Sequence, residues 1–574
     1  MKKRFGTFVL GTLTAVALFA MSALATDGIW TQPGAGTYTW SDGANWLGNN
    51  VANGTDANAL FNVTPGGDQT VNLDTAVTLG GLSLEWTDRR LTIAGPETLT
   101  LDVTSGTPII NVDSGRRVTI NTVLAGSDGL QLEGGGRLNL GGLSGFNNTL
   151  TGGVTVIGGI VEATEVRANS IGDGPISLSE GGQLILRGSN TSSSQVFVGT
   201  GGGLMQNRGN NHYQTTGILT GTGTLIYGNA GGSGGRSLRF LSTDNDFTGG
   251  FDFRNSLQTI RVNSLGGGNN IIFNASGTFL YDTGAVAALT LGAIELSGSS
   301  GTINNANSDH AVTINSDLIA TDGGAKTLTL TGAAGPTNMF AGAIADETDG
   351  GAGTVALTKS GASTWVLSGA NTYSGPTTIE AGTLSLGSSG AIASSTITVA
   401  SAGTLDVSEH GGWTLGASQT LQGNGTVNGD VTVNGVLSPG TSVGTLSFGS
   451  GLTLGNGSEI RFEFLDNSEA GTTYDQIVGL SLSLPTGETD SITLRVVGLQ
   501  DHTVALNDSF TVFTGTVNNF DASKIDIVNE SDWANGWEVS TGESLVLTAI
   551  PEPGTAGLLA IFAGAAILRR RLRK

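Results

Sequence analysis

The side chains that could carry out acid–base or metal chemistry are few and scattered in this sequence. The chain of 574 residues contains no cysteine, which excludes a disulfide scaffold, a thiolate metal site and a cysteine nucleophile. Its four histidines, His212, His310, His410 and His502, lie far apart in different sequence contexts. None is close to another histidine or to a serine in a nucleophile-elbow pattern. We therefore expect isolated surface histidines and no metal site built from several of them.

Two clusters of carboxylates are the remaining candidates for catalysis. Asp244 and Asp246 form one pair, and Asp346, Glu347 and Asp349 form the other cluster. A polysaccharide-cleaving enzyme would need such carboxylates to face each other in a groove. Both clusters lie in turn-rich segments, where solvated carboxylates are the common outcome. No calcium-loop pattern is present either. We expect no catalytic residue, no metal ligand and no cofactor.

Tryptophan is concentrated near the N-terminus. Four of the eight tryptophans, Trp30, Trp40, Trp46 and Trp86, lie within residues 26–95. Aromatic rings such as Trp40 and Trp46 could form a platform for a glycan. Alternatively, they could fill the open end of a repeat structure, where the first repeat has no neighbour to pack against. We favour the second interpretation and expect residues 26–95 to form a Trp-rich N-terminal β cap.

The stretch 357–386 shows what kind of element positions these residues. Short apolar alternations are separated by Gly, Asn, Ser and Pro, and each alternation has the length of a β-strand. No run is long enough for an amphipathic helix. The pattern predicts an all-β protein with many short strands.

A nine-residue pattern in this stretch occurs three times in the chain. It reads Asn, any residue, a bulky apolar residue, Ser or Thr, Gly, then Gly or Pro, two variable residues and an apolar residue. The copies are Asn148–Val156, Asn245–Phe253 and Asn371–Ile379. Recurring units that cannot bury their own apolar face favour a parallel β-solenoid, in which stacked coils share one core. An antiparallel β-sandwich with Gly-rich hairpins is the alternative.

Residues Asn371–Gly375 and Ala381–Leu384 closely resemble the autotransporter-associated β-strand repeat of bacterial surface proteins. The resemblance implies a right-handed parallel β-helix on an exported protein. We expect the repeat body at 96–440, followed by C-terminal β coils and a β-rich cap at 441–550. The run Trp40–Trp46 also resembles an N-terminal motif of this family.

Both ends of the chain resemble export signals. Residues 1–25 combine a basic start, an apolar segment and a small-x-small cleavage site at Ala23 and Ala25, as a secretory signal peptide does. Residues 551–574 resemble a PEP-CTERM sorting signal. Its residues are Pro551, Glu552, Pro553, an apolar stretch, and Arg569, Arg570 and Arg571. That resemblance implies an exosortase-type enzyme as partner and a transient anchor in the inner membrane. Transfer to the surface or extracellular matrix of a Gram-negative-type bacterium would follow.

Charge excludes one class of partner. Residues 26–550 contain 17 basic and 46 acidic residues, a net charge of −29, so we expect no nucleic-acid binding. We expect an exported, non-enzymatic surface or matrix protein with a structural or adhesive role, with extracellular polysaccharide as a candidate partner. A carbohydrate-binding surface protein and a β-helix polysaccharide lyase or hydrolase are the alternatives.

Overall fold

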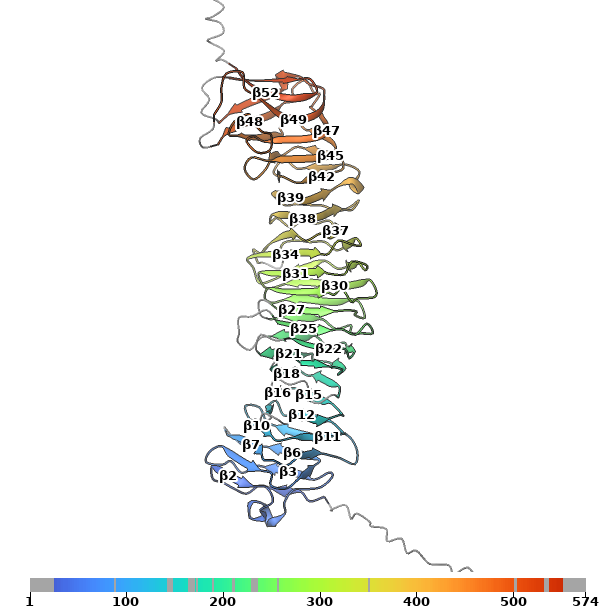
Figure 1. Cartoon of the computed structure of the whole chain (residues 1–574), viewed down its shortest axis with the longest axis vertical. Helices are drawn as coiled ribbons and strands as arrows, with labels where there is room; N and C mark the ends of the chain where they lie inside the picture. Colours follow the sequence, from blue (N-terminus) through green and yellow to red (C-terminus); the bar gives the residue numbers. More distant parts are fainter. Residues whose placement is uncertain are drawn as a thin grey trace, which may run out of the picture. The chain divides into compact units, whose positions relative to one another are not determined.

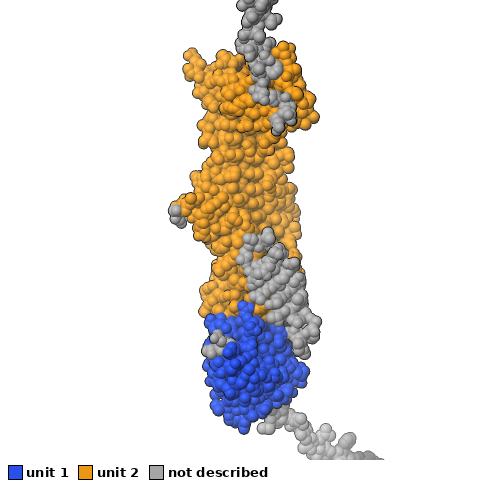
Figure 2. Space-filling model, turned by 90° about the vertical axis from the view of Figure 1, so that its left-hand side faces the viewer, with its two compact units in different colours: residues 1–153 blue, residues 154–574 orange. Residues whose placement is uncertain are grey.

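The computed structural model describes residues 25–550 apart from eleven short segments. These segments are 87–88, 142–147, 164–170, 172–173, 188–189, 209–211, 229–235, 255–257, 349–350, 500–502 and 531–535. The chain divides into two compact units, Met1–Gly153 and Val154–Lys574 (Figure 2).

Short β-strands make up nearly all of the regular structure, and they wind into a parallel β-solenoid of about 16 turns. The described residues contain no α-helix. They do contain four single 3₁₀ turns: η1 (Gly43–Asn45), η2 (Leu47–Asn49), η3 (Ser408–His410) and η4 (Ala522–Lys524). The prediction of an all-β solenoid is confirmed. The alternative of antiparallel sandwiches is wrong, because the strand ladders of the repeat body are parallel.

Unit 1 has three parallel sheets, one for each face of its coils. Their strands, sheet by sheet, are β1 (Gly28–Ile29), β3 (Asn58–Phe61), β6 (Gly81–Leu84), β9 (Ile109–Val112) and β12 (Leu130–Glu133); β2 (Gly36–Thr39), β4 (Gln69–Asn72), β7 (Arg90–Ala94), β10 (Arg117–Asn121) and β13 (Arg137–Leu140); and β5 (Val77–Leu79), β8 (Leu99–Leu101), β11 (Leu124–Gly126) and β14 (Thr149–Leu150).

Unit 2 contains one parallel ladder that runs from β19 to β50, which we call the long ladder (Figure 1). Its strands are β19 (Asn190–Ser192), β22 (Tyr213–Thr215), β25 (Arg236–Phe240), β27 (Gln258–Val262), β29 (Gly277–Tyr281), β31 (Ser300–Asn305), β34 (Ala325–Gly332), β36 (Thr354–Lys359), β38 (Thr377–Leu386), β39 (Thr396–Asp406), β41 (Thr420–Gly423), β44 (Val436–Pro439), β46 (Glu459–Phe464), β48 (Ile492–Gly498) and β50 (Ile525–Asn529).

Further ladders form the other faces of the coils in unit 2. Their strands are β15 (Val154–Ile157), β16 (Ile160–Ala163), β17 (Ile176–Ser179), β18 (Gly182–Arg187), β20 (Val196–Val198), β21 (Gly203–Arg208), β23 (Leu219–Gly221), β24 (Leu225–Gly228), β26 (Phe251–Phe253), β28 (Asn269–Phe273), β30 (Leu289–Leu296), β32 (Val312–Ile314), β33 (Leu318–Ala320), β35 (Asn338–Phe340), β37 (Thr364–Leu367), β40 (Trp413–Leu415), β42 (Thr426–Asn428), β43 (Val431–Val433), β45 (Thr445–Leu454) and β47 (Gln476–Ser483).

The two-residue alternation of the strands separates the core from the outer face. In the long ladder, Ile260, Phe279, Ile303 and Leu330 are in register on successive coils, and all are fully buried. The residue before each of them points to the opposite face, because successive side chains of a strand alternate. These four outer positions and the three that follow in register form a column of seven threonines: Thr259, Thr278, Thr302, Thr329, Thr358, Thr378 and Thr398.

The asparagine of the recurring pattern joins one coil to the preceding coil. In all three copies its side-chain oxygen accepts a hydrogen bond from a backbone N–H 24 to 27 residues earlier. The bonds are 2.9 Å from Leu124 to Asn148, 2.7 Å from Leu219 to Asn245 and 2.8 Å from Ile344 to Asn371. The bulky residue two positions later is fully buried in each copy. The residues of this pattern therefore fix the spacing between neighbouring coils.

Aromatic clusters fill the interior near both ends of the described chain. In unit 1, Trp30 and Trp40 pack edge-on against Trp46, with ring centroids 5.0 Å and 4.9 Å away. In unit 2, Phe464 and Phe510 pack against Trp537 at 5.7 Å and 5.9 Å. Antiparallel strands β49 (Ser509–Asn518), β52 (Ser544–Ile550) and β51 (Gly536–Thr541) complete this C-terminal end, as the predicted β-rich cap requires (Figure 1).

Candidate functional site

The two tryptophans considered for glycan contact lie inside the fold. Trp40 is 0% exposed and Trp46 is 2% exposed. Their indole N–H groups donate to the carbonyl oxygens of Ala52 (2.9 Å) and Trp40 (2.8 Å). Neither ring presents a face on which a sugar could stack, so this placement favours the interior-packing interpretation over the glycan platform.

The carboxylates considered for catalysis bind backbone N–H groups or face solvent. Asp346 accepts hydrogen bonds from Val355 and Ser374, and Glu347 accepts from Gly323 and Gly353. These bonds tie turns of neighbouring coils together. Asp244 and Asp246 are exposed, and Asp349 lies outside the described residues. In the part of the chain that the structure describes, no group of three or more metal-binding side chains converges.

The export signals lie almost entirely outside the described residues. Ala25 is described and exposed, whereas Ala23 and the tail residues Pro551, Glu552, Pro553, Arg569, Arg570 and Arg571 are not described. Within the described ranges, no helix combines the length and the apolar character needed to span a bilayer. Both signals stay predictions from the sequence.

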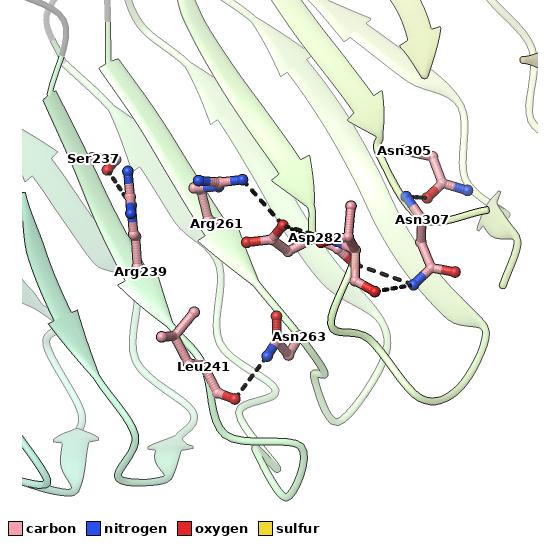
Figure 3. Close-up of polar contacts among 9 residues, drawn as sticks. Ser237, Arg239, Leu241, Arg261, Asn263, Asp282, Asn305 and Asn307 are labelled. Carbon is pink, nitrogen blue, oxygen red and sulfur yellow. Dashed lines mark hydrogen bonds and ion pairs between the residues drawn. The ribbon is translucent and has the colours of Figure 1, made fainter. Parts of the chain in front are cut away.

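A polar cluster on the outer face of the long ladder is centred on β25 and β27. We call it the arginine cluster; its members are His212, Ser237, Arg239, Arg261 and Asp282. Figure 3 shows these residues apart from His212. Arg239 and Arg261 are in register on adjacent strands. Adjacent strands lie about 4.8 Å apart, so the two guanidinium groups share one small area of the surface.

Ser237 holds Arg239 in place. Its side-chain oxygen accepts a hydrogen bond from Arg239 Nε at 3.0 Å and lies 2.7 Å from His212 Nδ1. Burial and the positive charges of Arg239 and Arg261 lower the pKa of His212 from its usual value. With Nδ1 unprotonated, His212 accepts a hydrogen bond from the Ser237 hydroxyl, and the hydrogen bonds then run from Arg239 through Ser237 to His212. Ser237 is only 4% exposed, which leaves its hydroxyl inaccessible as a nucleophile.

Asp282, in the turn that follows β29, positions Arg261. Its Nη2 lies 3.1 Å from Asp282 Oδ1, and its buried Nε has no acceptor among the described residues. Asparagines join the equivalent turns of neighbouring coils. Asn263 donates to the carbonyl oxygen of Leu241 at 2.7 Å, and Asn307 donates to that of Asp282 at 3.2 Å (Figure 3). The arrangement is an ordered set of cationic donors, which suits recognition of carboxylates or other oxyanions.

Sequence reasoning missed this cluster because the residues that meet across neighbouring coils are 21 to 25 positions apart in the sequence. His212 is exposed, as expected of a surface histidine, and its ring contacts Ser237 on the next coil. The distribution of basic residues is the signal that could have found it. Six of the 17 basic residues of the body lie between Arg187 and Arg261, together with only three acidic residues.

Two comparisons relate the chain to known proteins. Residues 131–163 and 357–386 match the passenger-associated-transport-repeat family. This confirms the predicted autotransporter-associated repeat, and the second match runs from within β36 to the end of β38. The chain is also similar to the adhesin BmaC autotransporter of Brucella suis biovar 1 (strain 1330), with 31% identity over 279 residues. That similarity covers 48% of this chain but only 7% of the length of the relative.

Proposed function

We propose that this protein is an exported, non-enzymatic surface or matrix protein whose solenoid has an adhesive and structural role. The observation that carries the proposal is the similarity to a protein named as an adhesin, over nearly half of this chain. The fold supports it. Stacked coils present long, regular outer faces, and such faces suit binding to extended partners.

The placement of the polar side chains supports a role in binding more than one in catalysis. The clustered carboxylates Asp346 and Glu347 are engaged with backbone N–H groups, and the buried Ser237 is engaged with Arg239 and His212. A hydrolase or lyase would instead need such groups to face a substrate in a groove.

We also propose that the C-terminal tail directs sorting. This proposal rests on the sequence alone, in which Pro551–Pro553 is followed by an apolar stretch and a basic end. An exosortase-type enzyme would remove the tail after a transient stay in the inner membrane. The body would then reach the cell surface or the extracellular matrix.

Fractionation of the producing cells, together with intact mass measurement and an adhesion assay, tests the proposal. We expect a species that begins at Thr26 and ends near Pro551, located outside the inner membrane. Cells that lack the chain should be retained less well on a polymer-coated surface than cells that make it. Full-length chain retained in the inner membrane would contradict sorting, and unchanged retention of the cells would contradict adhesion.

A tail variant and a matched body variant separate sorting from anchoring. Glu552→Ala alters the proposed recognition motif and leaves the apolar and basic segments intact, so uncleaved chain should accumulate in the membrane fraction. Glu538→Ala changes one carboxylate on β51, in the body of the protein, and should leave processing unchanged.

A further inference from the structure

We propose that the arginine cluster and the hydroxyl-lined furrow beside it form a binding surface for a uronic-acid polysaccharide. Such a polymer carries a carboxylate on a hydroxyl-rich sugar ring. The inference rests on the proposed function, because it names the partner of the adhesive surface and the face that binds it.

The first argument is the position of positive charge in an acidic chain. The chain carries a net charge of −22, and the only basic residues between residues 262 and 460 are Lys326 and Lys359. Both lysines are buried, with exposed fractions of 3% and 0%. The coils of the long ladder between residues 262 and 460 therefore offer no accessible lysine or arginine. Arg239 and Arg261 lie on the coils that come just before them.

The second argument is that Arg239 has spare donor capacity. Arg254, Arg461 and Arg495 each form an ion pair with a carboxylate. Among the described residues no carboxylate pairs with Arg239, whose one hydrogen bond is from Nε to Ser237. Its terminal nitrogens are therefore available to an external carboxylate, which a guanidinium binds through two parallel hydrogen bonds.

The third argument is the surface that adjoins the cluster. Thr259 precedes Arg261 by two residues on β27, so both side chains lie on the same face of the sheet. A furrow of about 360 Å³ begins there and crosses β27, β29 and β31. Its lining is rich in hydroxyl groups: Gln258, Thr259, Ser276, Gly277, Thr278, Ser300 and Thr302.

Hydroxyl groups can both donate and accept, so this furrow matches the hydroxyl groups of a sugar ring. The strands beneath it are paired on both sides within the long ladder, so no free strand edge is offered to a peptide. The remote acidic coils do not prevent binding, because the Debye length is about 8 Å at physiological ionic strength.

Binding of the purified full chain to polygalacturonate tests the inference, with the fully methyl-esterified polymer as the control ligand. Biolayer interferometry at about 0.15 M salt keeps long-range repulsion screened. We expect binding to the free acid and at least tenfold weaker binding to the ester. Loss of a bidentate guanidinium contact in Arg239→Gln should weaken binding by about tenfold.

Matched variants separate the surface from general charge. Arg254→Gln removes an arginine that is already paired with Asp252, and it should change the affinity by less than about twofold. Thr278→Val removes a furrow hydroxyl and keeps the side-chain shape, so it should weaken binding measurably. Thr358→Val makes the same change in the same column, outside the residues that line the furrow, and should not.

Several outcomes would overturn the inference. One is equal binding of the free acid and the ester, and another is an equal effect of Arg254→Gln and Arg239→Gln on the affinity. A third is a loss of self-association on mutation of Arg239, which would assign the surface to a second copy of the chain. Arg239→Lys retains the positive charge but cannot form two parallel hydrogen bonds to a carboxylate, so it should give an intermediate affinity. This variant keeps the test valid if Arg239→Gln fails to fold. Cells that display Arg239→Gln but still adhere would refute this partner while leaving the proposed adhesive function intact.

Discussion

Individual buried polar side chains decide how neighbouring coils are joined. Asn371 is 2% exposed; it accepts from Ile344 N and donates to the carbonyl oxygen of Ala391 at 2.9 Å. One side chain therefore connects the coil before it to the coil after it. A buried backbone donor left without a partner costs about 1–3 kcal/mol, so these asparagines matter more than their size suggests.

Substitution of Asn371 by alanine should lower the free energy of unfolding by about 1–3 kcal/mol, because Ile344 N loses its acceptor. Asn371→Asp keeps that acceptor, but it loses the donor to Ala391 and buries a carboxylate, so it should also lower the stability at neutral pH. Thr372→Ala, at the exposed neighbouring position, should stay within about 0.5 kcal/mol of the parent protein. Urea denaturation measures all three, and equal stability of Asn371→Ala and Thr372→Ala would refute this role.

Lys359 is a charged residue in an apolar column. It is in register with Leu330 and Ile379, fully buried, and its ammonium group donates to the carbonyl oxygens of Ser360, Gly361 and Ala381 at 2.8–2.9 Å. Burial lowers the pKa of Lys359 to about 8. Below that pH both the folded and the unfolded chain carry the proton. Between about 8 and the ordinary value of 10.5, only the unfolded chain keeps it.

The stability contributed by Lys359 should therefore rise as the pH increases from about 8 to 10.5. The full gain is on the order of 3 kcal/mol for a shift of this size. A Lys359→Met variant should lack this increase, and it should be less stable at pH 7 because three carbonyl oxygens lose their donor. Urea denaturation of both proteins at several pH values checks the difference, and parallel curves would contradict the expectation.

At the level of elements, close approach of backbones sets where glycine is required. In the recurring pattern, a Cβ atom at Gly375 would overlap the carbonyl oxygen of Val355 on the preceding coil. Gly249 and Gly152 meet backbone atoms of earlier turns in the same way. The glycines of these turns thus allow β38 and the equivalent strands to stack at the distance that backbone hydrogen bonding needs.

Gly375→Ala should accordingly separate the turn from β36 and destabilise the fold by about 1–3 kcal/mol, the range typical of overpacking. Gly542→Ala is the matched control. No atom lies within 4 Å of a Cβ built at that position, so its effect should be small. Thermal unfolding followed by circular dichroism distinguishes the two, and a neutral Gly375→Ala would show that the turn can move without cost.

At the scale of the whole molecule, the excess of acidic residues opposes compactness. Local ion pairs such as Arg495 with Glu459 at 2.7 Å bring opposite charges together, but they leave the net charge of −22 unchanged. Surface pairs of this kind contribute about 0–1 kcal/mol each, whereas repulsion among the unpaired carboxylates acts across many coils.

Added salt should therefore raise the melting temperature. Increasing the ionic strength from about 0.01 M to 0.15 M shortens the Debye length from about 30 Å to about 8 Å, which screens distant repulsion more than close pairs. Differential scanning calorimetry in sodium chloride measures the shift. A lower melting temperature in salt would mean that ion pairs such as Arg495–Glu459 outweigh the repulsion.

The class of fold could be predicted from the sequence, because strand alternation and turn residues are local properties. The three copies of the asparagine pattern predicted stacked coils, and the structure gives each asparagine the same bond to the preceding coil. Which distant residues meet, in contrast, depends on how the coils stack. His212, Ser237, Arg261 and Asp282 come together because successive coils place residues 21 to 25 positions apart side by side. Coil length varies with its turns, so alternation along one strand does not specify which residue of the next coil lies beside it. Burial was decided at the same level: Trp40 and Trp46 are interior because three sheets close around them, which no local pattern records.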